Sequence, residues 1–275
     1  MEELFDIALR KYEGREEVVN IPDTITTIGA SAFANNRSIH EVVIPEGVRI
    51  IEDEAFSACV NLRHVTLPST LEHISYGAFK GCWRLVEIEI PDGITKLEAR
   101  TFARCRSLAS AKLPADLVEI GDGCFMHCGK LSYVEFPETV QRIGATAFYD
   151  CQTLTVAGFG ENIDTIDNEA FRRCSALTEA VLPATLDWLG QRCFEDCTGI
   201  VRAALPMGIS YIEERTFMGC KNLAEIEIPS TITHIESKAF SGCESLERSM
   251  LEIPKGCVIA DDAFDEEADE SKAQS

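Results

Sequence analysis

The sequence predicts a mostly β solenoid of the α/β repeat class, built as one continuous array, because a 23-residue phrase repeats about ten times without an insertion. Each copy carries an apolar residue before the proline slot, and this residue recurs as Ile21, Ile44, Leu67, Ile90, Leu113, Phe136, Phe159, Leu182, Leu205 and Ile228. A phenylalanine recurs at the same period as Phe33, Phe56, Phe79, Phe102, Phe125, Phe148, Phe171, Phe194, Phe217 and Phe240. All ten prolines of the chain directly follow such an apolar residue, at the position that we call the proline slot. Only Gly160 takes the place of a proline in this series.

Two strand signals occur in each copy. Val65 and Leu67 alternate with residues that point the other way, which predicts a strand that proline then ends. Strands of successive copies are expected to stack ~4.8 Å apart as a parallel sheet of about eleven members, from residues 16–21 to residues 246–253. A second apolar pair, such as Leu71 and Ile74, follows a turn rich in Gly, Thr, Asp and Asn and predicts another short strand.

The two ends depart from the repeat and are interpreted as caps. Residues 1–15 form an N-terminal cap, in which Leu4, Phe5, Leu9 and Tyr12 cover the first coil as either helix or strand. Residues 16–264 form a solenoid of about ten coils, whose register slips near Pro254 at its end. Residues 265–275 are acidic and predict a disordered tail.

Charge and composition limit the partners and the location. The formal net charge of −21 disfavours nucleic acid and anionic membrane surfaces as partners. The N-terminus lacks the pattern of a secretory signal, and no apolar run is long enough to span a membrane. We therefore expect a cytoplasmic protein without membrane insertion; the alternative is a cell-surface or secreted protein.

Cysteine is a structural residue in this interpretation. A row of nine at the repeat period comprises Cys59, Cys82, Cys105, Cys128, Cys151, Cys174, Cys197, Cys220 and Cys243. Side chains in such a row run parallel, which disfavours disulfides and predicts free, buried thiols that fill space. Cys124 and Cys193 each add a partner four residues before the row, so zinc binding and a local redox bridge remain alternatives there. No catalytic motif and no histidine ligand spacing occur, and we expect no catalytic residues, no metal and no cofactor.

The phrase Ile-Pro-x-x-Val-x-x-Ile-x-x-x-Ala-Phe-x-x-Cys-x-x-Leu, as in residues 44–62, resembles the BspA-like class of leucine-rich repeats. The resemblance covers roughly residues 19 to 264. It implies a curved leucine-rich-repeat solenoid with a parallel β-sheet on its concave face. Members of this class occur in surface and secreted proteins of anaerobic bacteria and some protozoa, are thought to bind proteins, and share no known catalytic site.

Function is expected where the repeat leaves residues free to vary, on the outward positions of the sheet. An apolar patch with a charged rim is predicted in the middle of the array, with Tyr133, Val156, Val181 and Ala204 beside Glu179 and Arg202. A second variable row holds Trp188 and Tyr211, followed by His234, either as binding residues or as a cover for the side of the core. These residues predict a non-enzymatic protein–protein interaction module, and the alternative is an adhesion protein of an anaerobic microbe. The partner's identity and the oligomeric state stay open.

Overall fold

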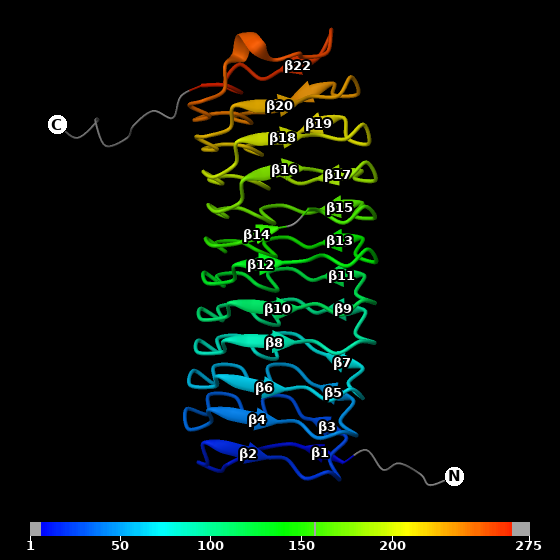
Figure 1. The fold of residues 1–275 in the computed structure, drawn as a ribbon, viewed down its shortest axis with the longest axis vertical. Helices are drawn as coiled ribbons and strands as arrows, with labels where there is room; N and C mark the ends of the chain where they lie inside the picture. Colours follow the sequence, from blue (N-terminus) through cyan, green and yellow to red (C-terminus); the bar gives the residue numbers. More distant parts are fainter. Residues whose placement is uncertain (1–6, 157, 266–275) are drawn as a thin grey trace, which may run out of the picture.

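The computed structural model describes residues 7–156 and 158–265, and they form a column of stacked coils (Figure 1). β1 and β2 lie at one end of the column and β22 at the other. No α-helix occurs in the described residues, and none of their helical structure is long and apolar enough to cross a membrane. The mostly β solenoid expected from the repeat is confirmed.

The first strand column consists of the strands that precede the proline slot (Figure 1). Its members are β2 (Val18–Asn20), β4 (Glu41–Val43), β6 (His64–Thr66), β8 (Glu87–Glu89), β10 (Ser110–Lys112), β12 (Tyr133–Val134), β14 (Thr155–Val156), β16 (Glu179–Val181), β18 (Arg202–Ala204) and β20 (Glu225–Glu227). They pair in parallel within three groups, β2 to β6, β8 to β14 and β16 to β20. In β10 the central residue Ala111 is buried, whereas Ser110 and Lys112 face outward, as the alternation of side chains along a strand requires.

The second strand column confirms the short strand expected from the second apolar pair. Its members are β1 (Ala8–Leu9), β3 (Thr27–Ile28), β5 (Ile50–Ile51), β7 (His73–Ile74), β9 (Lys96–Leu97), β11 (Glu119–Ile120), β13 (Arg142–Ile143), β15 (Thr165–Ile166), β17 (Trp188–Leu189), β19 (Tyr211–Ile212), β21 (His234–Ile235) and β22 (Val258–Ile259). Parallel pairing again links neighbouring coils, in groups β1 to β7, β9 to β17 and β19 to β22. In most of these strands the second residue is buried and the first is left to vary.

A stack of aromatic rings runs through the core from one end to the other. Consecutive phenylalanines of the repeat lie parallel, with ring centroids 4.7 to 5.8 Å apart. Tyr12 extends the stack at the first coil, 4.9 Å from Phe33, and Phe264 extends it at the last, 5.2 Å from Phe240. The ends of the chain therefore protect the terminal rings from water.

Two backbone positions in each coil adopt the left-handed conformation, two residues before and two residues after the phenylalanine. All fifteen non-glycine residues with positive φ in the described part of the chain occupy these two rows, for example Thr146 at 54° and Arg104 at 64°. Such angles favour glycine, because a Cβ atom crowds the following carbonyl. The tight turns around the phenylalanine impose them regardless of residue type.

At the ends of the array, one predicted strand is absent, and the N-terminal cap contains a strand where a helix or a strand had been possible. A strand predicted over 246–253 is wrong: the segment contains a 3₁₀ helix, η1 (Arg248–Met250), because the chain is longer here before Pro254 and closes a turn of its own. At the other end, β1 pairs with β3, so the described part of the N-terminal segment contains a strand. Leu4, Phe5 and residues 266–275 lie outside the described residues.

Candidate protein-binding surface

The outward positions of the first strand column hold most of the predicted contact residues. Tyr133 of β12 is 46% exposed and Val181 of β16 is 43% exposed. Glu179 and Arg202 are exposed as well, and Ala204 of β18 is half-buried. Register places Glu179 opposite Arg202 and Val181 opposite Ala204. The strands β16 and β18 thus present an aliphatic pair next to a charged pair.

Val156 lies in a different register from the one expected. β14 places Thr155 opposite Tyr133, and Val156 opposite the inward-facing Val134. Thr155 therefore takes the position in the Tyr133 row that the period assigns to Val156. This shift occurs in the coil where Phe159 and Gly160 replace the usual aliphatic residue and proline.

An ion pair borders the patch on its C-terminal side. The Arg202 guanidinium donates through Nη2 to Glu227 Oε1 at 2.6 Å, and Glu227 lies opposite Ala204. This hydrogen bond to Glu227 is the main cause that raises the pKa of Arg202, whose guanidinium is cationic at physiological pH in any environment. Apolar surface with such a charged rim is typical of protein-binding sites.

The aromatic row lies on the second strand column, apart from the patch. Trp188, Tyr211 and His234 are the outward residues of β17, β19 and β21, in consecutive coils. The rings of Tyr211 and His234 stack in parallel with centroids 4.6 Å apart. Trp188 and Tyr211 stay exposed while their neighbours Leu189 and Ile212 enter the core. The predicted contact residues thus form two groups on two strand columns.

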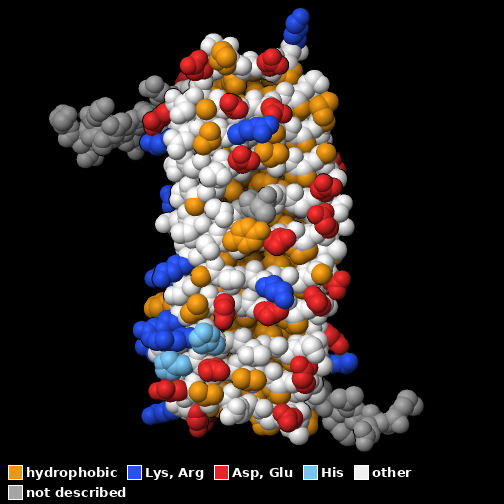
Figure 2. Space-filling model, in the orientation of Figure 1, with side chains coloured by type: hydrophobic (Ala, Val, Ile, Leu, Met, Phe, Trp, Pro, Cys, Tyr) orange, Lys and Arg blue, Asp and Glu red, His pale blue; other side chains and the backbone are white. Residues whose placement is uncertain are grey.

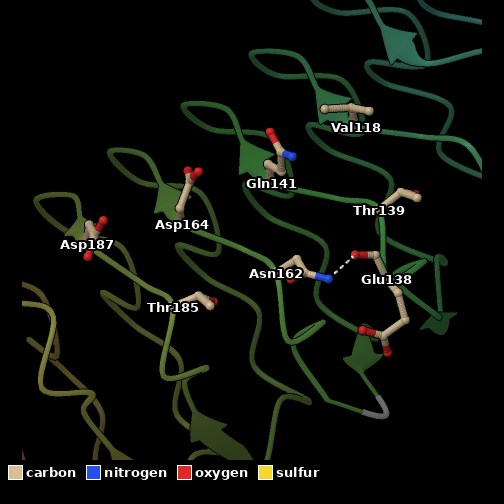
Figure 3. Close-up of a pocket in the computed structure, with 8 residues that line it drawn as sticks. All are labelled: Val118, Glu138, Thr139, Gln141, Asn162, Asp164, Thr185 and Asp187. Atoms are coloured by element: carbon tan, nitrogen blue, oxygen red, sulfur yellow. Dashed lines mark hydrogen bonds between the residues drawn. The ribbon is translucent and has the colours of Figure 1, made fainter.

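A polar groove of about 880 Å³ runs along the column between the turns that follow the proline slot and the second strand column (Figure 3). Its lining is Val118, Glu138, Thr139, Gln141, Asn162, Asp164, Thr185 and Asp187. The Thr139 and Thr185 hydroxyls donate to backbone carbonyls, and the Asn162 amide donates to the Glu138 carbonyl at 2.8 Å. These groups hold the turns together and leave no activated nucleophile in the groove.

The cysteine side chains are free, and ten of the twelve are buried. Burial raises the pKa of the Cys59 and Cys105 thiols to about 12, so they remain protonated at neutral pH. His127, between Cys124 and Cys128 in sequence, turns outward and pairs with Asp150 at 2.9 Å. Across residues 7–156 and 158–265, no three His, Cys, Asp or Glu side chains gather as a metal site.

A second groove, which was not predicted from the sequence, lies at the turns before the first strand column. It has a volume of about 410 Å³ and is lined by Arg63, Arg84, Val86, Ser107, Ala109 and Lys130. Figure 2 shows Lys, Arg and His side chains gathered at this edge of the N-terminal coils. The signal was available, because segments 60–63, 83–86, 106–109 and 129–132 contain no Asp or Glu.

Solved structures of bacterial leucine-rich repeat proteins are similar to this chain. A leucine-rich repeat protein of Bacteroides ovatus ATCC 8483 is 26% identical with a TM-score of 0.60, over 87% of this chain and 76% of that one. A leucine rich cell surface protein of Faecalibacterium prausnitzii A2-165 is also 26% identical, with a TM-score of 0.57, over 93% of this chain and 80% of that one. No curated protein sequence matches the chain significantly.

The sequence profile of the BspA type leucine rich repeat region matches residues 26–155 and 142–268, which together span nearly all of the described coils. This match agrees with the period, the stacked parallel strands and the similar bacterial structures. The chain belongs to the BspA type leucine-rich repeat family.

Proposed function

We propose that the chain is a non-enzymatic protein-interaction scaffold that binds a protein partner on the first strand column, around Tyr133, Val181 and Ala204. The observation that supports this proposal is the exposure of two large apolar side chains on a face where the repeat itself requires none. Glu179 and the Arg202–Glu227 pair supply the polar rim that orients a partner. No metal or cofactor enters the proposal.

Trp188 and Tyr211 supply a second contact row in this proposal. Aromatic side chains bury a large area at a small cost in conformational entropy, and they are enriched among residues that dominate binding energy. Their place on the second strand column suits a partner that wraps around one side of the coils. Val156 belongs to the proposed contact surface because its strand, β14, pairs with β12, which carries Tyr133.

Affinity capture from the source cells, followed by titration of the captured and purified protein, tests the patch. Val181→Glu is expected to weaken binding about tenfold or more, because it places a carboxylate in the centre of an apolar contact. Val43→Glu is the matched control, since Val43 is 42% exposed on the same column at β4, far from the patch. Equal affinity of the wild-type protein and the Val181→Glu variant for every captured protein would refute the patch.

A second candidate function is adhesion at the cell surface or in the secreted fraction of an anaerobic microbe. The similarity to the cell surface protein of Faecalibacterium prausnitzii favours it. Fractionation of source cells, combined with protease treatment of intact cells, distinguishes the two locations. Cleavage of the protein on intact cells supports adhesion, and protection together with recovery in the cytosol supports an internal scaffold.

A further inference from the structure

Positive charge is concentrated along one edge of this acidic molecule. The turns between the cysteine row and the first strand column carry Arg37, Arg63, Arg84, Arg106 and Lys130 in the first five coils. The four-residue segments after the cysteine row contain no carboxylate until Glu244, although the chain as a whole has 46 acidic and 25 basic residues. Such segregation gives this edge a local potential opposite to that of the rest of the surface.

The backbone fixes the spacing of the turns that carry these cations. Val86 N donates to Arg63 O at 3.1 Å, and Ala109 N donates to Val86 O at 2.8 Å, so neighbouring turns are hydrogen-bonded like the strands beside them. The backbones of successive turns therefore lie about 5 Å apart along the edge. Arg63, Arg84 and Lys130 line the same groove and are exposed.

In the described part of the chain, these cations have no carboxylate partner. Many other arginines form ion pairs there, for example Arg142 with Glu119 and Arg202 with Glu227. Glu41 and Glu87 lie on the neighbouring strands β4 and β8, so acidic surface borders the edge and the cationic strip is narrow. Cations that line one groove without carboxylate partners are suited to a ligand that brings its own carboxylates.

Apolar surface accompanies the charge. Val86 is 41% exposed in the groove, and Trp83 next to it is 47% exposed, with the Arg106 guanidinium 5.1 Å above its ring. Ala109 completes the apolar part of the groove lining. The groove thus combines an apolar lining with cationic side chains at its borders.

We propose that this cationic edge, formed by Arg63, Arg84, Arg106 and Lys130 around Val86, binds a short acidic polypeptide segment that carries an apolar residue among its carboxylates. A short segment fits because the strip spans only a few coils, about 15 to 20 Å, which about six extended residues cover. A long nucleic acid would extend past the strip onto a surface of net negative charge and be repelled there. Lys130 comes three residues before Tyr133, so the edge adjoins one end of the patch, whereas Val181 lies on β16 in a later coil and is not part of the groove lining.

Fluorescence titration with labelled peptides of about eight residues tests the edge. One peptide alternates Glu and Asp with a central Leu, and a second replaces each acid by its amide. We expect the wild-type protein to bind the acidic peptide alone, with an affinity that falls as salt is raised. Simultaneous Arg63→Glu, Arg84→Glu and Lys130→Glu substitutions are expected to weaken binding about thirtyfold or more, because three attractions become repulsions.

The control variant carries Arg10→Glu, Arg49→Glu and Lys255→Glu, which change the net charge equally on exposed residues outside the groove. It is expected to bind within about threefold of the wild-type protein, and both variants should retain the wild-type circular dichroism spectrum. Equal weakening in both variants, no binding by the wild-type protein, or tighter binding of oligouridylate than of the acidic peptide would each overturn the proposal. Val181→Glu is expected to leave peptide binding unchanged, so this surface and the patch fail independently.

Discussion

Each cysteine of the repeat row donates its S–H to the carbonyl of a phenylalanine 26 residues earlier, over distances of 2.9 to 3.2 Å. The same carbonyl also accepts a backbone N–H: Phe56 O accepts from Cys59 N and from Cys82 Sγ. In the first coil Asn36 replaces cysteine, and its side-chain amide donates to Gly14 O. The thiols therefore satisfy buried acceptors as well as filling space.

The buried thiols predict a loss of stability in base. An unfolded thiol has its ordinary pKa of about 9, whereas burial raises the pKa of Cys105 in the folded state to about 12. Between these values the folded state binds more protons, so its stability is full below pH 8 and falls above about pH 9, by about 1.4 kcal/mol per pH unit for each buried thiol. Denaturant titrations under reducing conditions from pH 7 to about pH 10.5 measure this slope.

Cys105→Ala should reduce that slope by one thiol's share, whereas Cys257→Ser should change it less, because Cys257 is only partly buried. Thiolate absorbance that rises near pH 9 in the folded Cys257→Ser variant would contradict the burial of the remaining thiols.

The left-handed positions offer a stabilising substitution. Thr146 is β-branched and has a φ of 54°, a conformation that costs about 1–2 kcal/mol relative to glycine. After the greater backbone entropy of unfolded glycine is deducted, Thr146→Gly is expected to stabilise the protein by about 0.5 kcal/mol. Thr139→Gly serves as the contrast: its hydroxyl donates to the Leu117 carbonyl, so its loss should destabilise by about 1 kcal/mol. Urea unfolding that ranks the two variants in the opposite order would refute the strain argument.

At the scale of the element, the aromatic stack joins each coil to the next. Rings about 5 Å apart bury each other on both faces, except where the column ends. Tyr12 and Phe264 cover those ends, and both come from segments that depart from the repeat. Terminal units of this kind protect a solenoid from fraying.

Substitutions along the stack should therefore differ by position. Phe125→Ala in the middle removes a ring with neighbours on both sides and is expected to cost about 3–5 kcal/mol. Tyr12→Ala uncovers one face of Phe33 and should cost about 1–2 kcal/mol. Hydrogen exchange should show faster opening of the first coil alone for Tyr12→Ala, and of the whole array for Phe125→Ala. Whole-array opening in both variants would contradict a stack built from nearest-neighbour contacts.

Across the whole molecule, the period predicts the fold because it repeats the same packing problem in every coil. Ile44, Phe56 and Leu62 are buried, their counterparts in the other copies are buried or packed against the core, and only stacked coils cover them all. The second strand column could be predicted from apolar pairs such as Leu71 and Ile74, which recur at the repeat period and are buried in the structure.

The period could not predict features that local geometry decides. The left-handed rows carry Arg, Glu, Thr and Lys in many coils, so no glycine pattern marks them. The register shift at β14 occurs without an insertion in the sequence. The 3₁₀ helix at 248–250 occurs where Ser249 takes the inward position of the predicted strand and the chain is longer before Pro254.

Binding residues are harder to predict than the fold, because the repeat does not require a particular residue type at the outward positions. Tyr133, Val181 and Trp188 stand out only by being apolar at positions that face outward. The cationic edge is hard to predict because its residues come from four turns and gather only when the coils are stacked.

Photocrosslinking with benzoylphenylalanine in place of Tyr133 tests the central proposal most directly, and the same group in place of Glu41, an outward residue of β4, is the control. We expect a protein adduct at position 133 that Val181→Glu suppresses, with little or no adduct at position 41. Adducts of equal yield at both positions, or an adduct at 133 that Val181→Glu leaves unchanged, would contradict a binding surface centred on Tyr133 and Val181.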